Sequence, residues 1–116
     1  AAIDARMGEL YWGGYQFDAQ GEMSCVIPEQ VIAGIDAPVP ESGEWFGVGS
    51  GWLSDAEILN NRCGERMIGI DTELLPHAAD IALLAAPIID KGEGVAAAEA
   101  LPIYLRDQVA HKSKKA

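Results

Sequence analysis

The side chains that could carry out chemistry are few in this 116-residue chain, and they lie far apart. The two histidines are His77, at the start of an expected helix, and His111, in the last six residues. Neither belongs to an HExxH pair or to a similar metal motif. The serines available as nucleophiles, Ser24, Ser42, Ser50 and Ser54, lack a nucleophile elbow and a positioned histidine base. The sequence therefore predicts neither a catalytic metal nor an acyl-transfer triad.

Two carboxylates, Asp4 and Glu9, flank an expected turn near the start of the chain. Paired carboxylates can hold a metal ion or act as general acid and base. The simpler interpretation is an ion pair between Asp4 and Arg6 that fixes the turn, worth at most ~1 kcal/mol at an exposed site. We favour the ion pair over the catalytic alternative.

Glycines alternate at positions 47, 49 and 51, immediately before Trp52 and a possible helix at Ser54-Asp55. Bare backbone amides in such a segment can face a phosphate group. The segment has no lysine, no GxGxxG and no GKS or GKT sequence. We therefore favour a structural role, in which Gly49 and Gly51 let Trp52 pack closely, and keep a ligand-binding loop as the alternative.

A β-hairpin is the first element that the sequence predicts. Residues 1–5 are short and apolar, Arg6-Met7-Gly8 supplies a turn, and residues 9–17 are rich in strand-forming aromatics. A third strand is expected over residues 22–27, and Pro28-Glu29 then favours a short helix that stops near Gly34. The later expected elements are a loop at 37–44, strands at 44–50 and 66–71, and helices at 55–61, 77–90 and 94–100.

The helix expected over residues 77–90 is apolar nearly all round, which predicts that it is buried or lies between two layers. Pro87 falls inside it and would kink or end it. With 49% hydrophobic residues, a chain of this length can close one core but is too short for two ordinary domains.

The charge of the chain is strongly acidic, at −10. Up to Ala110 the chain has 18 acids against 5 bases, which disfavours direct binding to nucleic acid. A basic tail begins at His111 and is expected to be disordered, with contact to RNA as the alternative. No apolar run is long enough to span a membrane and no signal peptide is expected, which favours a cytoplasmic protein. Cys25 and Cys63 are expected to be free thiols in a reducing cytosol, although the sequence leaves a disulfide open.

Four segments together resemble the second half of the bacterial TsaB (YeaZ) family. They are AAIDARMGELYW at the start, GVGSGW, Leu75-Pro76 before a helix, and AEALPIYLRDQVA near the end. The resemblance runs from Ala1 to about His111 with the order and spacing of the segments maintained. It implies an α/β (α+β) fold, namely a ribonuclease-H-like lobe of the actin-like ATPase superfamily with a mixed five-stranded sheet and helices. On this basis residues 1–110 form the second lobe, residues 111–116 are a tail, and Ala1 is an interior position of a longer chain.

The resemblance also implies a function. The family supports the catalytic subunit TsaD, together with TsaE, in making threonylcarbamoyladenosine beside the tRNA anticodon, and the full-length protein forms a homodimer. A non-catalytic scaffold without cofactor or metal is therefore expected. The alternatives are a nucleotide-binding hydrolase that uses the glycine-rich segment and a glycoprotease-like peptidase, and an isolated lobe could also pair with a second copy through apolar surface. The residues expected to matter are structural: Arg6 and Gly8 in the turn, Gly49, Gly51 and Trp52 in the glycine-rich segment, and Tyr104 with Arg106, which would tie the C-terminal segment to the sheet.

Overall fold

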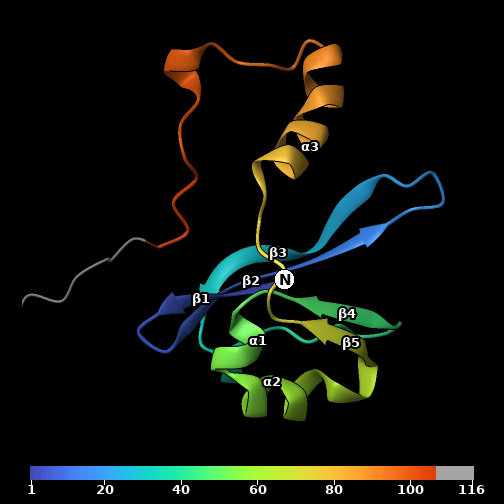
Figure 1. The fold of residues 1–116 in the computed structure, drawn as a ribbon, viewed down its shortest axis with the longest axis vertical. Coiled ribbons are helices and arrows are strands. Elements are labelled where there is room, and N and C mark those ends of the chain that lie inside the picture. Colours follow the sequence, from blue (N-terminus) through green and yellow to red (C-terminus); the bar gives the residue numbers. More distant parts are fainter. Residues whose placement is uncertain (107–116) are drawn as a thin grey trace, which may run out of the picture. The chain divides into compact units, whose positions relative to one another are not determined.

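The computed structural model describes residues 1–106 and divides the chain into two units, Ala1–Leu75 and a second unit that begins at Pro76. Every strand found in residues 1–106 lies in the first unit (Figure 1). The mixed α/β class predicted from the sequence is confirmed.

The N-terminal hairpin forms as predicted. Strand β1 (Ala2–Arg6) pairs antiparallel with β2 (Glu9–Phe17), with Ala2 opposite Trp12. Three consecutive residues, Arg6, Met7 and Gly8, take positive φ angles of 65°, 60° and 74° to make the turn. Only glycine adopts this conformation without steric cost, so Gly8 fits the turn while Arg6 and Met7 are each strained by it.

Strand β3 (Met23–Ile32) completes a three-stranded antiparallel sheet in the order β1-β2-β3 and corrects the prediction for residues 28–32. The short helix expected from Pro28 is wrong, because the strand continues to Ile32. Trp12 lies opposite Gln30 and Gly14 opposite Ile27, so two residues of β3 face one of β2 in a bulge that contains Pro28. A proline is tolerated in a bulge on an edge strand, where its missing N–H removes no ladder hydrogen bond.

A second, parallel sheet pairs β4 (Trp45–Val48) with β5 (Met67–Asp71), as the strands expected at 44–50 and 66–71. Between them lie α1 (Gly51–Ser54) and α2 (Ala56–Cys63), and 3₁₀ turns occupy Gly34–Asp36 and Gly64–Arg66. Hydrogen bonding thus divides the five strands into sheets of three and two, in place of the single five-stranded sheet expected. The ribonuclease-H-like and actin-like assignments stay predictions.

The core of the first unit lies where the hairpin meets the helices. Its buried members are Ala2, Leu10, Trp12, Ala37, Trp52, Leu59 and Cys63. Helix α2 supplies Leu59 and Cys63, which stand one helical turn apart and so share a face. This core fixes the positions of β1 and of the segment that follows β4.

The second unit contains helix α3 (Ala78–Asp90) and a 3₁₀ turn at Ala97–Glu99. Helix α3 runs through Pro87 rather than ending there, and none of its residues is buried, so the burial expected from its sequence is not observed. The helix expected at 94–100 is wrong, because only one short turn forms; so few residues cannot offset the cost of nucleating a helix. Among the described residues no helix is long and apolar enough to span a membrane. The tail at 111–116 lies outside the described residues.

Candidate functional site

The first predicted site is the hairpin turn, which the structure shows to be held by local polar contacts. The Arg6 backbone N–H donates to Oδ1 of Asp4 at 2.8 Å, and the Arg6 guanidinium contacts Oδ2 of Asp4 at 3.2 Å. The Arg6 side chain is 87% exposed, so the ion pair is screened by water and contributes at most ~1 kcal/mol. The predicted ion pair is confirmed.

The second predicted site, residues 49–52, packs directly on β1, and we call it the glycine junction. Gly49 has a φ of +100°, and a Cβ there would collide with the carbonyl oxygen of Ala2. A Cβ on Gly51 would lie 2.9 Å from both Ala2 Cβ and Leu10 Cδ2. The Ser50 hydroxyl accepts a hydrogen bond from the Asp4 backbone N–H at 3.2 Å. The backbone of the glycine junction is thus covered by β1, which suits close packing better than a phosphate loop.

The remaining predicted residues lie in the second unit. Tyr104 is exposed and Arg106 is half-buried, and their role in tying the C-terminal segment to the sheet stays a prediction. His77 immediately precedes α3, and His111 lies outside the described residues. Within residues 1–106 no three His, Cys, Asp or Glu side chains gather where they could hold a metal ion.

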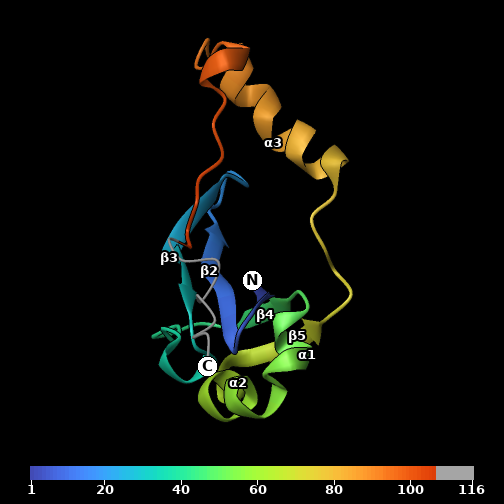
Figure 2. The same ribbon diagram turned by 90° about the vertical axis from the view of Figure 1, so that its left-hand side faces the viewer.

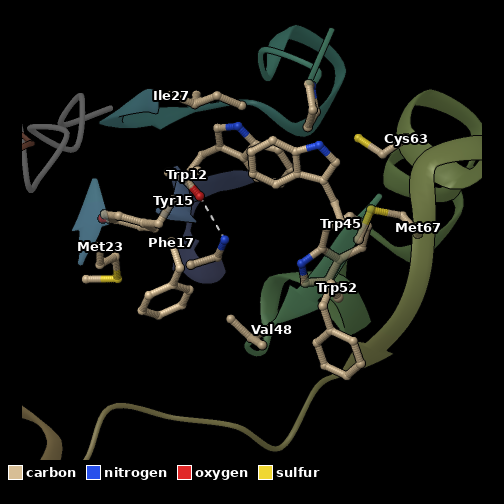
Figure 3. Close-up of a pocket in the computed structure, with 15 residues that line it drawn as sticks. Trp12, Tyr15, Phe17, Met23, Ile27, Trp45, Val48, Trp52, Cys63 and Met67 are labelled. Carbon is tan, nitrogen blue, oxygen red and sulfur yellow. Dashed lines mark hydrogen bonds between the residues drawn. The ribbon is translucent and has the colours of Figure 1, made fainter. Parts of the chain in front are cut away.

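The structure adds a feature that the sequence analysis missed, an apolar opening of about 250 Å³ in the first unit. We call it the tryptophan crevice, because Trp12, Trp45 and Trp52 surround it together with Phe17, Val48 and Met67 (Figure 3). The other residues that line it are Ala1, Gly13, Gly14, Tyr15, Met23, Ile27, Pro40, Phe46 and Cys63. Its walls come from β2 and β3 on one side and from β4 on the other, and no side chain among them carries a formal charge at neutral pH.

The three indole N–H groups of the tryptophan crevice differ in their partners. Trp12 donates to the carbonyl oxygen of Pro38 at 3.1 Å, and Trp45 donates to that of Ser42 at 2.7 Å. The Nε1 of Trp52 is buried and has no partner. Trp52 instead packs on Trp12, with ring centroids 5.8 Å apart and planes inclined by 46°. A buried donor without an acceptor costs about 1–3 kcal/mol. Among the described residues that line the crevice, Trp52 is the one with a buried side-chain nitrogen that lacks a hydrogen-bond partner.

Two titratable groups at the tryptophan crevice are held in their neutral forms. Burial and a hydrogen bond to the Glu29 carboxylate raise the pKa of the Tyr15 hydroxyl. Burial likewise raises the pKa of the Cys63 thiol, although Arg62 and Arg66 oppose the shift. Both cysteines are free thiols, Cys63 buried and Cys25 exposed. A neutral, buried thiol is a poor nucleophile, so the crevice is suited to binding apolar groups rather than to catalysis.

The sequence contains little signal for the tryptophan crevice. Its three tryptophans lie in three separate elements, β2, β4 and α1, and only the tertiary fold brings them together. Gly13-Gly14 was the nearest hint, because paired glycines in a strand indicate a bulge or a close backbone approach.

Comparison with known proteins places this fold in a class. No family model matches the chain. Two solved structures from Pseudomonas aeruginosa, one described as YeaZ and one as an uncharacterized protein with similarity to peptidase YeaZ, superpose with a TM-score of 0.75 at 45% identity. Each alignment covers 90% of this chain and 47% of the solved chain. Over the 90% that is matched, the chain therefore has a mixed α/β fold of the YeaZ type.

A curated relative gives the family. The tRNA threonylcarbamoyladenosine biosynthesis protein TsaB of Escherichia coli (strain K12) is 39% identical over 118 residues, which cover 97% of this chain and 49% of the relative. The chain matches the TsaB (YeaZ) family along 97% of its length, as its sequence segments indicated, and it spans about half the length of the relatives that it matches.

Proposed function

We propose that this chain acts in the biosynthesis of threonylcarbamoyladenosine in tRNA, as the second lobe of a non-catalytic TsaB-type subunit. The observation that carries the proposal is the 39% identity to TsaB along 97% of the chain. Identity spread over a whole lobe preserves surfaces as well as the core, and surfaces are what an assembly subunit needs.

The chemistry of the described residues supports a scaffold. The first unit contains no histidine, so no imidazole can serve there as a general base. The tryptophan crevice is apolar, and its one thiol is neutral and buried. The acidic balance of the chain, at −10, also repels tRNA phosphates. We therefore assign contact with tRNA to a partner.

That partner is TsaD in our proposal, with TsaE joining the same cytoplasmic assembly and the longer protein forming a homodimer. TsaD would carry out the transfer of the threonylcarbamoyl group, and this lobe would stabilise or activate TsaD by binding to it. No cofactor or metal is assigned to this lobe.

A second candidate is a peptidase or nucleotide hydrolase, which one similar structure favours because it is described by its similarity to a peptidase. A hydrolase would use the glycine-rich segment for phosphate. Against it, Gly49 and Gly51 have their open side filled by Ala2, and helix α1 has only four residues. The backbone amides of the glycine junction are therefore poorly placed to receive a nucleotide.

The test is a complementation experiment with the full-length protein that contains this lobe, in bacteria that lack their own TsaB. We expect mass spectrometry of digested tRNA to show restored threonylcarbamoyladenosine. The variant H77A/H111A, which removes both imidazoles of this chain, should restore the nucleoside to the same level as the unaltered protein.

Two results would contradict the proposal. One is a failure to restore the nucleoside by a protein that is folded and expressed. The other is loss of restoration in H77A/H111A while that variant still melts like the parent and co-purifies with TsaD, because a catalytic imidazole would then be required. Peptidase or ATPase activity of the purified chain alone would favour the second candidate.

A further inference from the structure

The chain between β3 and β4 contains a loop whose backbone is fixed by distant side chains. We call residues 37–42 the proline loop, because its sequence is Ala-Pro-Val-Pro-Glu-Ser. Arg62 of α2 donates to the carbonyl oxygen of Ala37 at 2.6 Å. Arg66, in the 3₁₀ turn after α2, donates to that of Glu41 at 3.2 Å. Figures 1 and 2 show this part of the chain passing beside α2, which therefore sets the course of the loop.

Two tryptophans hold the proline loop from the side of the sheets. The indole N–H of Trp12 in β2 donates to the carbonyl oxygen of Pro38. That of Trp45 in β4 donates to the carbonyl oxygen of Ser42. The rings of Pro38 and Pro40 fix two φ angles as well. The loop is therefore pre-organised, so a ligand that binds to it loses little affinity to loop ordering.

A groove of about 370 Å³ lies between the proline loop and β3, and we call it the proline groove. One apolar wall consists of Val26, Ile27 and Pro28 of β3, and the other consists of residues 38–40 of the loop. Trp45 also lines the groove. Apolar walls of this kind suit the aliphatic stem of a long side chain whose polar head stays near water.

The polar groups that line the proline groove are suited to a cation. They belong to Gln16, Glu41 and Ser42, and among the lining residues Glu41 is the one with a formal charge. The bond from Arg66 is made to the Glu41 backbone, so it does not use the Glu41 carboxylate. Because the Trp45 indole N–H is bonded to Ser42, Trp45 contributes ring surface to the groove, and a tryptophan ring attracts cations.

We propose that the proline groove binds an arginine side chain that an extended segment of a partner protein presents. The aliphatic stem of that arginine would lie between the proline loop and β3, with its guanidinium against Trp45 and the Glu41 carboxylate. The proposal is independent of the role in tRNA modification, because it concerns the chemistry of the groove alone.

Charge complementarity supports a basic occupant. Residues 1–75 contain 13 Asp and Glu residues against three Arg residues, so the first unit as a whole attracts cations and repels nucleic acid. A guanidinium donates two parallel hydrogen bonds to a carboxylate and stacks on aromatic rings, whereas an ammonium group does neither. A carboxylate beside a tryptophan ring therefore favours arginine over lysine.

The same charge favours an arginine within a protein over the free amino acid. Free arginine carries an α-carboxylate, which the acidic first unit repels, and an amide-linked arginine does not. The apolar walls of the proline groove also extend over six residues, and a peptide covers them with its flanking side chains.

The test titrates the isotope-labelled 116-residue chain with the pentapeptide acetyl-Ala-Val-Arg-Val-Ala-amide and follows its NMR signals. The control peptide has citrulline in place of arginine, which keeps the shape of the side chain and removes its charge. We expect the arginine peptide to shift the indole signal of Trp45, assigned with W45F, and the backbone amides of Glu41 and Ser42. The citrulline peptide should bind at least about fivefold more weakly.

Two matched variants test the carboxylate. E41Q removes the charge of the groove but keeps the backbone carbonyl that accepts from Arg66, so the proline loop should stay in place. E57Q removes the same charge from an exposed position of α2 that does not line the groove. We expect E41Q to weaken binding of the arginine peptide at least about fivefold and E57Q to weaken it less than about twofold.

Four results would overturn the proposal. They are equal binding of the arginine and citrulline peptides, equal binding of the arginine peptide to E41Q and E57Q, and unmoved signals of Trp45, Glu41 and Ser42 at millimolar peptide. The fourth is free arginine that shifts these signals as strongly as the peptide does, because the groove would then be a small-molecule site.

Discussion

The glycine junction and the tryptophan crevice adjoin each other in the first unit, yet one is filled and the other is open. At the junction, β1 supplies Ala2 and Asp4 against Gly49, Gly51 and Ser50, and the contact leaves no room for a Cβ on either glycine. In the crevice, residues of β2 and β4 line an apolar opening, and Ala1 is hydrogen-bonded to Gly13 beside it. The difference teaches that β1 can pack on the glycine junction only because two of its residues have no side chain.

The largest expected effect comes from enlarging the filled side. G51V should lower the free energy of unfolding by about 3 kcal/mol, because its side chain would press on Ala2 and Leu10 at 2.9 Å in a packed core. Chemical denaturation measures the loss. G64A is the matched control, since a Cβ there meets nothing within 4 Å, and it should change the free energy by less than about 0.5 kcal/mol. Equal effects would show that the junction is not tightly packed.

The next effect sharpens the comparison through two tryptophans that pack on each other. W12F removes both packing and the hydrogen bond to Pro38, whereas W52F removes packing and a donor that has no acceptor. W12F should therefore destabilise the chain by about 1 kcal/mol more than W52F. A larger loss in W52F, measured by the same denaturation, would mean that Trp52 Nε1 has a partner in solution.

The reaction rates of the two thiols test whether Cys63, which lines the tryptophan crevice, is shielded from reagents. Iodoacetamide at mildly alkaline pH should modify the exposed Cys25 rapidly, while Cys63, only 2% exposed and with a raised pKa, should react at least about tenfold more slowly. Peptide mass spectrometry separates the two sites. Equal rates would contradict the burial of Cys63.

The same raised pKa gives a signed pH dependence. A thiol whose folded pKa lies above its unfolded value contributes stability at pH below the unfolded pKa and loses that contribution as pH rises through the folded pKa. The melting temperature of the parent should thus fall more steeply above about pH 9 than that of C63A. Parallel curves for the two proteins would show that Cys63 titrates normally.

The smallest effect is in the hairpin turn that leads into β2. Met7 has a φ of 60°, which costs an ordinary residue about 1 kcal/mol, and its side chain is exposed. M7G should therefore raise the free energy of unfolding by up to about 0.5–1 kcal/mol. A destabilised M7G would indicate that the Met7 side chain makes contacts worth more than the strain.

Local chemistry explains how much of this fold the sequence could predict. Arg6-Met7-Gly8 and the aromatic run after it predict the hairpin correctly, because turn residues and strand propensity agree there. Pro28 misled the prediction: beside Glu29 it is typical of a helix start, and only the edge position and bulge of β3 make it compatible with a strand. The spacing of Gly49 and Gly51 predicts a close approach but not its partner, because a Cβ on either glycine would meet Ala2 and it is Gly47 that lies against Trp52. The tryptophan crevice depends on contacts between β2, β4 and α1 that no local pattern encodes.

The contrast between the filled junction and the open crevice is tested most directly by hydrogen exchange in the unaltered 116-residue chain. The backbone N–H groups of Tyr11, Tyr15 and Phe17 point to the same side of β2, because alternate residues of a strand share a side. On that side Tyr11 pairs with Ile3 of β1, whereas no strand of the described residues pairs with Tyr15 or Phe17. We expect the Tyr11 amide to exchange at least about tenfold more slowly than those of Tyr15 and Phe17. Equal, slow exchange at all three would contradict the account, because it would show that the β2 edge is already paired.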